Sequence, residues 1–359
     1  MKASVADWTV AVPAASALLL GAALYLPLHP VVTLACVAAL MAVVVAAVHH
    51  AEVVAHRVGE PFGTLVLALA ITVIEVALVV SMMLAGGAEK AALARDSVYA
   101  AVMIICTGVV GACLLTGALR HHEQSFRIEG AGPALAALVT LATMVLILPV
   151  FTTTVPGPRY SKAQLGFTAV ASLSLWAVFV FVQTIRHRDY FLPSEAADDE
   201  SAHAAPPTLR QAWASFALLF VSLVAVVGLA KVLSPAIEAA VDALEAPPAV
   251  IGVAIAALVL LPEASAAVRA ALANRLQTSM NLALGSALAC IGLTIPAVAL
   301  ASVLLDFPLV LGLDAKDLVL LVLAFVVSTI TLGTGRTNLM QGAVHLVIFA
   351  AYLFLTLVP

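Results

Sequence analysis

Two glutamates stand alone inside long apolar stretches of this chain, and their chemistry is the clearest indication of its function. Glu75 lies in PFGTLVLALAITVIEVALVVSMMLA, and Glu263 lies in AVIGVAIAALVLLPEASAAV. If these stretches span a bilayer, each carboxylate lies near the middle, where its charge costs at least about 2.5 kcal/mol. Carboxylates at that depth usually mark ion pathways or proton relays. We therefore predict that Glu75 and Glu263 form one shared site that binds a metal cation or protons.

A carboxyl group away from water is stable when it holds a proton or binds a cation, and it is unstable when bare and charged. Competition between these two states is the basis of proton antiport. Cation binding on one side of the membrane expels the proton, and protonation on the other side expels the cation. The two glutamates therefore predict a secondary cation/proton antiporter that works by alternating access.

Several polar or small residues near the glutamates are candidate secondary ligands or pathway residues. Thr72 lies one helical turn before Glu75, and Ser265 follows Glu263. Pro262 has no amide proton and frees a backbone carbonyl about four residues earlier, so an interrupted helix could offer that oxygen to a cation. Further candidates in neighbouring apolar stretches are Thr107, Gly285 and Ser286. The alternatives stay open: a hydroxyl can bond to its own helix, and Gly285 and Gly292 can be close-packing positions.

The composition places these residues in a membrane protein. The chain has 359 residues, of which 64% are hydrophobic and 10% charged, with a mean hydropathy of +1.15, whereas soluble domains carry roughly 25% charged residues. A net charge of −4 gives no basic surface for nucleic acid. The expected partners are membrane lipid and the transported cations and protons, with no cofactor. The four cysteines lie in apolar segments without paired spacing, which indicates buried small residues: Cys36, Cys106, Cys113 and Cys290.

The predicted fold is all-α and polytopic. Because a helix needs about 20 apolar residues to cross the hydrocarbon core, the chain divides into eleven predicted spans. They are 8–28, 31–50, 61–85, 97–119, 131–151, 165–185, 211–233, 248–271, 280–304, 317–334 and 340–358. The first span is longer than a signal-peptide core and is expected to be a retained helix.

The basic residues predict the orientation of the spans. The amino terminus and the connections after the even-numbered spans hold ten of the sixteen Lys and Arg residues, including nine of the eleven arginines. Positive residues favour the cytoplasmic side. The amino terminus is therefore predicted to be cytoplasmic and the carboxyl terminus to lie outside.

The positions of the glutamates indicate an inverted repeat. Glu75 is in the third predicted span and Glu263 in the eighth, and an odd offset of five means that the two helices cross in opposite directions. Inverted repeats that meet at a midplane site are a recurrent transporter design. The predicted organisation is a leading helix (1–30), a first five-helix repeat (31–185), an acidic cytoplasmic linker (186–210) and a second five-helix repeat (211–359).

Around both glutamates the sequence resembles the calcium/proton exchanger family of the calcium/cation antiporter superfamily. Residues 59–78 resemble the first family motif, which ends near the essential glutamate, and residues 260–296 resemble the second. TGRTNLMQGAVHL (334–346) is similar to the signature of the final helix, which brings Asn338 into the candidate pathway. The closest likeness is to the bacterial ChaA-type branch, sodium–potassium–calcium/proton antiporters. The resemblance implies ten core helices in two inverted repeats and a bacterial inner-membrane location.

The sequence departs from this family pattern at three positions. Family members commonly read Gly-Asn-x-x-Glu in both repeats, but Thr72 and Leu260 stand here where the asparagines would be. Calcium prefers six to eight oxygen ligands, so the loss of two amide oxygens favours a site that also takes Na⁺ or K⁺. Lys231 stands where exchangers often have an acidic residue near the outer end of the seventh span.

Two other function classes compete with proton antiport. A sodium-coupled calcium exchanger would share the fold and differ in the driving ion. A membrane enzyme could use Glu75 and Glu263 as paired acids, but the chain has no GxxxxGK[ST] loop, no HExxH and no evident nucleophile–base pair. No enzymatic activity is predicted. His345, in the last span, is expected to be a packing residue.

Overall fold

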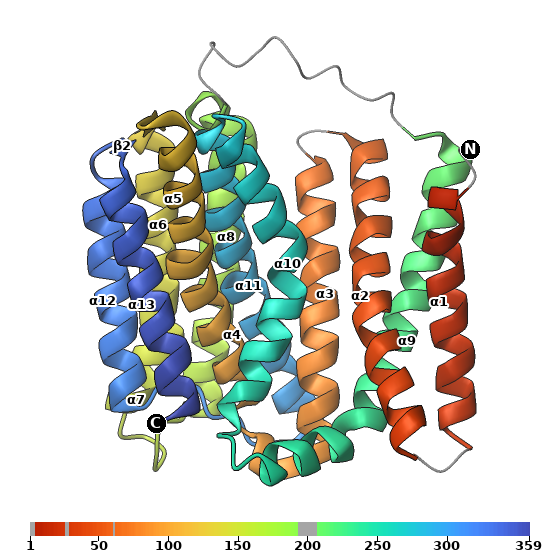
Figure 1. Ribbon diagram of the computed structural model, residues 1–359. Coiled ribbons are helices and arrows are strands. Elements are labelled where there is room, and N and C mark those ends of the chain that lie inside the picture. The colour runs from red at the N-terminus through yellow and green to blue at the C-terminus, as the bar shows by residue number, and fades with distance from the viewer. Residues whose placement is uncertain (1–3, 26–28, 60–61, 193–206) are drawn as a thin grey trace. The chain divides into compact units, whose positions relative to one another are not determined.

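The computed structural model describes residues 4–25, 29–59, 62–192 and 207–359 (Figure 1). In these ranges the regular structure is helical, apart from one antiparallel pair of two-residue strands, β1 (Gln124–Ser125) and β2 (Arg336–Thr337). Ten of the described helices or helix runs are long and apolar enough to cross a membrane, and the apolar part of α1 is a shorter one. The predicted all-α, polytopic fold with about eleven spans is confirmed. The acidic run predicted in the linker lies outside the described residues.

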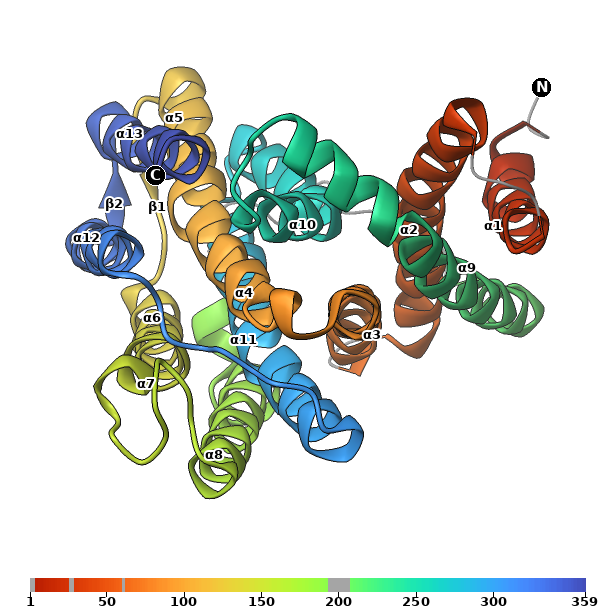
Figure 2. The ribbon, with the colours of Figure 1, turned by 90° about the horizontal axis from the view of Figure 1, so that it is seen from below.

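The described residues form two compact units. The first contains α1 (Ser4–Ala23), α2 (Pro30–Val58), α3 (Phe62–Gly86), the 3-10 turn η1 (Gly87–Lys90) and α9 (Leu209–Ala243). Within it, α2 contacts α1, α3 and α9, and both views of the ribbon show α2 beside α3 (Figures 1 and 2).

The second unit contains the remaining helices. In chain order they are α4 (Leu93–Met103), η2 (Ile104–Val109), α5 (Val110–His121), α6 (Ile128–Ala142), η3 (Thr143–Ile147), α7 (Leu148–Phe151), α8 (Lys162–Phe181), η4 (Val182–Arg186), η5 (Arg188–Phe191), α10 (Ala249–Leu272), α11 (Leu276–Leu305), α12 (Ala315–Leu332) and α13 (Leu339–Leu357). Here η2, η3 and η4 are π-helical turns and η5 is a 3-10 turn. Helix α10 packs on α4, α5 and α11, and α13 packs on α5 (Figure 2).

Local sequence signals explain where several helices begin and end. Pro30 at the first position starts α2, and Gly59 ends it with a φ of 76°, which suits glycine. Capping boxes, in which a polar side chain and a glutamine satisfy free amides, start α8 at Ser161 and α9 at Thr208. Helix α9 runs ten residues beyond its predicted end at 233, where the hydroxyl of Ser234 donates to Oε1 of Glu238 one turn later and supports the helix.

The two units do not follow the two predicted halves of the sequence. Helices α2 and α3 of the first half share a unit with α9 of the second half. After α1, each half of the chain supplies five spans, α2 to α8 and α9 to α13, so equivalent spans cross in opposite directions. In the second unit the β1–β2 pair joins two connections, and the arginine pattern predicts both of them to be cytoplasmic.

Candidate functional site

Each unit contains one of the two glutamates predicted to form the site. In the first unit, Glu75 lies in the middle of α3 and is only 3% exposed. Thr72, one turn earlier on the same helix, is also buried, and its hydroxyl donates to the carbonyl of Ala68 at 2.9 Å. The hydroxyl proton is therefore used by the helix itself, while the oxygen of Thr72 keeps lone pairs that could accept or coordinate.

In the second unit, Glu263 lies in α10, and both of its carboxylate oxygens are covered from solvent. Helix α10 runs without a break through Pro262, so the predicted interruption is limited to one missing amide. In a regular helix that amide would serve the carbonyl of Leu258. The backbone near Glu263 thus offers at most a local oxygen, and the predicted interrupted helix is wrong.

Ser265 follows Glu263 by two residues, and its contacts are local. Its hydroxyl donates to the carbonyl of Pro262 at 2.7 Å and accepts from Nη1 of Arg269 at 3.2 Å. A serine oxygen that accepts from a guanidinium is a poor cation ligand because the charge beside it repels the cation. Both of these hydrogen bonds of Ser265 lie within α10, and its predicted role as a ligand stays a prediction.

The helix of Glu263 contacts the segments that carry the other candidates in its unit. Helix α10 packs against η2, which holds Thr107, and against α11, which holds Gly285 and Ser286. Thr107 is fully buried, and its hydroxyl donates to the carbonyl of Met103. Ser286 is half-buried. These three candidates therefore belong to helices that meet the helix of Glu263.

The two candidate packing glycines of α11 have different surroundings. A methyl group added to Gly292 would lie 2.8 Å from Cβ of Trp176 on α8, so Gly292 is a close-packing position, as expected. A methyl group at Gly285 would meet no heavy atom of the described residues within 4 Å. The packing alternative is therefore wrong for Gly285, and its surroundings have room for a ligand or water.

Asn338 lies at a helix end rather than in mid-span. Its exposed side chain caps α13 by accepting from the amide of Gln341 at 3.2 Å. In the part of the chain that the structure describes, no group of three or more His, Cys, Asp and Glu side chains is arranged to hold a metal ion. The role of the two glutamates in binding a cation therefore stays a prediction.

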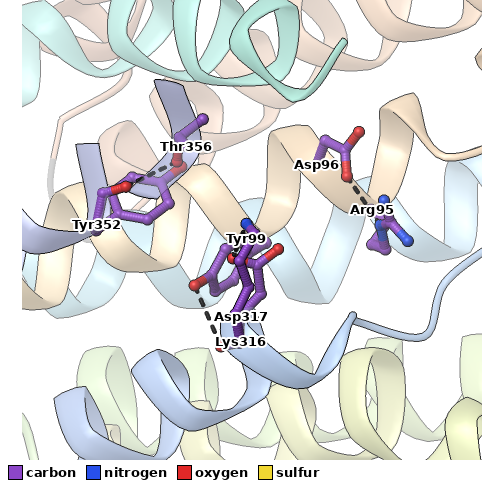
Figure 3. A network of polar contacts seen from close by, with 7 residues as sticks. All are labelled: Arg95, Asp96, Tyr99, Lys316, Asp317, Tyr352 and Thr356. Atoms are coloured by element: carbon purple, nitrogen blue, oxygen red, sulfur yellow. Dashed lines mark hydrogen bonds and ion pairs between the residues drawn. The ribbon is translucent and has the colours of Figure 1, made fainter. Parts of the chain in front are cut away.

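A polar network that sequence reasoning did not identify lies where α4 and α12 begin (Figure 3). Nε of Arg95 lies 2.8 Å from Oδ1 of Asp96, and Nη1 donates to the carbonyl of Gly312 at 3.1 Å. Across the network, Nζ of Lys316 lies 3.0 Å from Oδ1 of Asp317. The arginine therefore ties the start of α4 to the loop before α12.

This network also contacts the helix of Glu263. The hydroxyl of Tyr99 donates to the backbone carbonyl of Asp317 at 3.2 Å (Figure 3). Gly252 of α10 lies so close to α4 that an added methyl group would be 2.8 Å from Cβ of Asp96. The sequence does carry a signal for this network, since Arg95 and Asp96 form a charged pair at the start of an apolar span. Charged residues within spans are rare and usually functional.

The polar contacts of His345 on α13 are a second feature that the sequence did not reveal. It is completely buried, with Nδ1 2.7 Å from the carbonyl of Cys106 and Nε2 3.1 Å from the hydroxyl of Thr331. The expectation of simple packing is therefore incomplete, because both ring nitrogens have polar partners. An ionisable residue inside a span is itself a signal of function.

Comparison with known proteins agrees with this architecture. Residues 28–185 and 214–358 match the family described as sodium/calcium exchanger protein. The chain is 51% identical to y4hA of Sinorhizobium fredii over 88% of this chain and 86% of that protein. It is 37% identical to the sodium-potassium/proton antiporter ChaA of Escherichia coli over 85% of this chain and 83% of that protein.

Two solved structures show the same fold. Native YfkE aligns with 98% of this chain and 100% of its own, with a TM-score of 0.70 and 18% identity. The crystal structure of the H⁺/Ca²⁺ exchanger CAX aligns with 96% of this chain and 87% of its own, with a TM-score of 0.71 and 14% identity. At these identities the likeness concerns the fold alone.

Proposed function

The chain belongs to the sodium/calcium exchanger protein family, and we propose that it exchanges Na⁺, K⁺ and Ca²⁺ for H⁺ at Glu75 and Glu263. Family membership makes it a multi-pass membrane cation exchanger rather than an enzyme, and the 37% identical sodium-potassium/proton antiporter ChaA supports protons as the exchanged partner. The observation that carries the finer proposal is that each compact unit buries one glutamate within a spanning helix.

The burial of the glutamates supports their proposed role. A carboxylate with 3% exposure inside a span, such as that of Glu75, is stable only when its charge is neutralised. A proton or a cation can supply that neutralisation, but the two compete for the same oxygens. Each glutamate can therefore couple the loss of a proton to the uptake of a cation.

The proposed ion set rests on the composition of the site and on the relatives. The 37% identical ChaA is described as a sodium-potassium/proton antiporter, and the structurally similar CAX as an H⁺/Ca²⁺ exchanger. Thr72 supplies one hydroxyl oxygen, and Leu260 supplies no side-chain oxygen, at the positions one turn before the glutamates. A site poor in oxygen ligands suits Na⁺ and K⁺ at least as well as Ca²⁺.

We further propose a bacterial inner-membrane location with a cytoplasmic amino terminus and a periplasmic carboxyl terminus. The arginine asymmetry supports this orientation. The β1–β2 pair agrees with it, because the pair requires the connections at 124–125 and 336–337 to lie on one side of the membrane.

A flux measurement tests the proposed function. Everted membrane vesicles containing the protein are acidified by respiration, and a pH-sensitive dye reports proton release when NaCl, KCl or CaCl₂ is added. We expect each salt to release protons, whereas choline chloride should not. Absence of proton release with all three cations, at verified protein abundance, would overturn the proposal.

Sodium-coupled calcium exchange is the second candidate because the family description names that exchange. It predicts calcium uptake driven by a sodium gradient and insensitive to a protonophore. The same vesicles distinguish the two functions, since proton antiport makes calcium uptake collapse when the protonophore is added.

A further inference from the structure

The π turn η2, between α4 and α5, has an unusual hydrogen-bonding pattern. In an α-helix the amide of Val110 would serve the carbonyl of Cys106, four residues earlier. Here the amide of Val110 bonds instead to the carbonyls of Ile105 and Thr107. The π turn therefore takes from Cys106 its regular helical donor, and π turns of this kind often occur at functional sites.

His345 supplies a donor to that carbonyl from a residue 239 positions away. Its Nδ1 lies 2.7 Å from the carbonyl oxygen of Cys106, and since a carbonyl only accepts, Nδ1 must carry the proton. Its Nε2 lies 3.1 Å from the hydroxyl of Thr331 on α12, which fixes the ring from the other side. The imidazole thus connects three segments: η2, α12 and α13.

Helices α5 and α13 cross closely beside His345. A methyl group added to Gly111 would lie 2.9 Å from Cβ of His345, and one added to Gly342 would lie 2.5 Å from the amide nitrogen of Leu115. A glycine on each helix thus lets α5 and α13 approach closely at this crossing. This close crossing fixes the backbone from which the side chain of His345 reaches η2.

The π turn that His345 holds also packs against the helices that carry the candidate site. Besides α12 and α13, η2 contacts α10, which carries Glu263, and α11, which carries Gly285. A change in the register of η2 would therefore alter the surface presented to both helices.

We propose that His345 is a positioning residue: its hydrogen bond to the Cys106 carbonyl, braced by Thr331, holds the η2 turn in the π register that α10 and α11 pack against. The part of this proposal that concerns transport rests on the proposed function, and the part that concerns the turn does not. His345 acts through its hydrogen bond rather than by carrying a proton.

Side-chain replacements separate these possibilities. In His345→Asn the amide nitrogen occupies nearly the position of Nδ1 and can still donate to Cys106. In His345→Gln the amide reaches the position of Nε2 instead, and His345→Leu keeps neither bond. Thr356→Val is the matched control, because Thr356 is a buried residue of the same helix whose hydroxyl bonds only within α13.

The first readout is independent of transport. In protein with Cys36, Cys113 and Cys290 replaced by alanine, the labelling rate of buried Cys106 by a permeant maleimide reports how well η2 is held. We expect His345→Leu and His345→Gln to raise this rate by about threefold or more, as for loss of one hydrogen bond in a membrane protein. His345→Asn and Thr356→Val should stay close to the parent. An unchanged rate in His345→Leu would overturn the proposal.

The second readout is the cation concentration that gives half-maximal proton release. We expect His345→Leu and His345→Gln to raise it by about threefold or more, and His345→Asn to keep it within about twofold with an unchanged pH profile. If His345→Asn failed as His345→Leu does, the ring itself would be required and the positioning role would be wrong. Parent protein without any cation-dependent proton release would overturn the proposed function, and the labelling rate would still decide the role of His345 in holding the turn.

Discussion

The imidazole of His50 on α2 lies with Nε2 2.8 Å from the carbonyl oxygen of Thr9 on α1. Thr9 is four residues before Pro13, which has no amide proton to give to that carbonyl. A donor from α2 therefore takes the place of the missing helical amide. Within the first compact unit, this hydrogen bond joins α1 to α2 at the position where Pro13 removes a hydrogen bond from the α1 helix.

The first prediction is that His50→Leu lowers the thermal stability of the detergent-solubilised protein. Loss of an interhelical hydrogen bond in a membrane protein costs about 0.6 kcal/mol on average and up to about 1.7 kcal/mol. The unfolding temperature should fall by roughly 1–2 °C in a protein of this size.

Pro13→Ala provides the control for this prediction, since alanine restores the amide that Thr9 would receive in a regular helix. The loss caused by His50→Leu should therefore be smaller in the Pro13→Ala background. Equal losses in both backgrounds would show that the Thr9 carbonyl is not what His50 stabilises.

The second prediction is that Glu75→Gln and Glu263→Gln each abolish cation-dependent proton release in everted vesicles. An amide cannot titrate between charged and neutral states, and it supplies no charge to a cation. The matched control is Glu129→Gln, the same chemical change at an exposed residue in the first turn of α6. Retention of more than about half of the parent's exchange by either variant, at equal abundance, would remove that glutamate from the mechanism.

The spans could be predicted because their apolar length is a local property, whereas the finer features depend on distant contacts. The sequence predicts one regular helix over 97–119, whereas its π turn at Ile104–Val109 is hydrogen-bonded by His345, far along the chain. The predicted end of α9 at 233 is too early because the polar residues Ser234, Glu238 and Asp242 interrupt the apolar run. In the folded protein Nζ of Lys90 lies 3.7 Å from Oε1 of Glu238, a contact between distant segments that the sequence does not show.

The candidate site was predictable only in part for the same reason. A single glutamate in an apolar span is easily recognised in the sequence. In contrast, the spacing of glycines does not show which of them packs against a neighbouring helix. Gly285 and Gly292 lie on one helix seven residues apart, and only Gly292 meets a neighbour, Trp176. Likewise, Ser265 was a candidate ligand because it is close to Glu263 in the sequence, but in the folded helix its hydroxyl oxygen accepts from Arg269.

The third prediction concerns the orientation in the membrane. Ser125 and Thr153 are both exposed, and the arginine pattern assigns Ser125 to the cytoplasmic side and Thr153 to the outside. In a background lacking the four native cysteines, Thr153→Cys should react with an impermeant maleimide added to intact spheroplasts. Ser125→Cys should react only after the membrane is permeabilised. The reverse pattern would invert the proposed topology.

The last prediction concerns ion choice. Leu260 is buried on α10 one turn before Glu263, at the position where the family resemblance implies an asparagine, so the parent should accept Na⁺ and K⁺ as well as Ca²⁺. Exchange should be fastest at alkaline pH, because fewer protons then compete for the carboxylates. Leu260→Asn adds a carbonyl oxygen toward the cation and should raise the preference for calcium over sodium. The gain is bounded by one hydrogen bond to a charged group, about 1.5–3 kcal/mol, and desolvation of the amide keeps it below that bound.

Leu260→Met, which keeps the size without adding an oxygen, is the control and should leave the ratio unchanged. Calcium prefers a full set of oxygen ligands, which is why the two missing amides predict a site that also takes Na⁺ and K⁺. A parent protein that moved calcium alone, without sodium- or potassium-dependent proton flux up to about pH 9, would contradict this prediction.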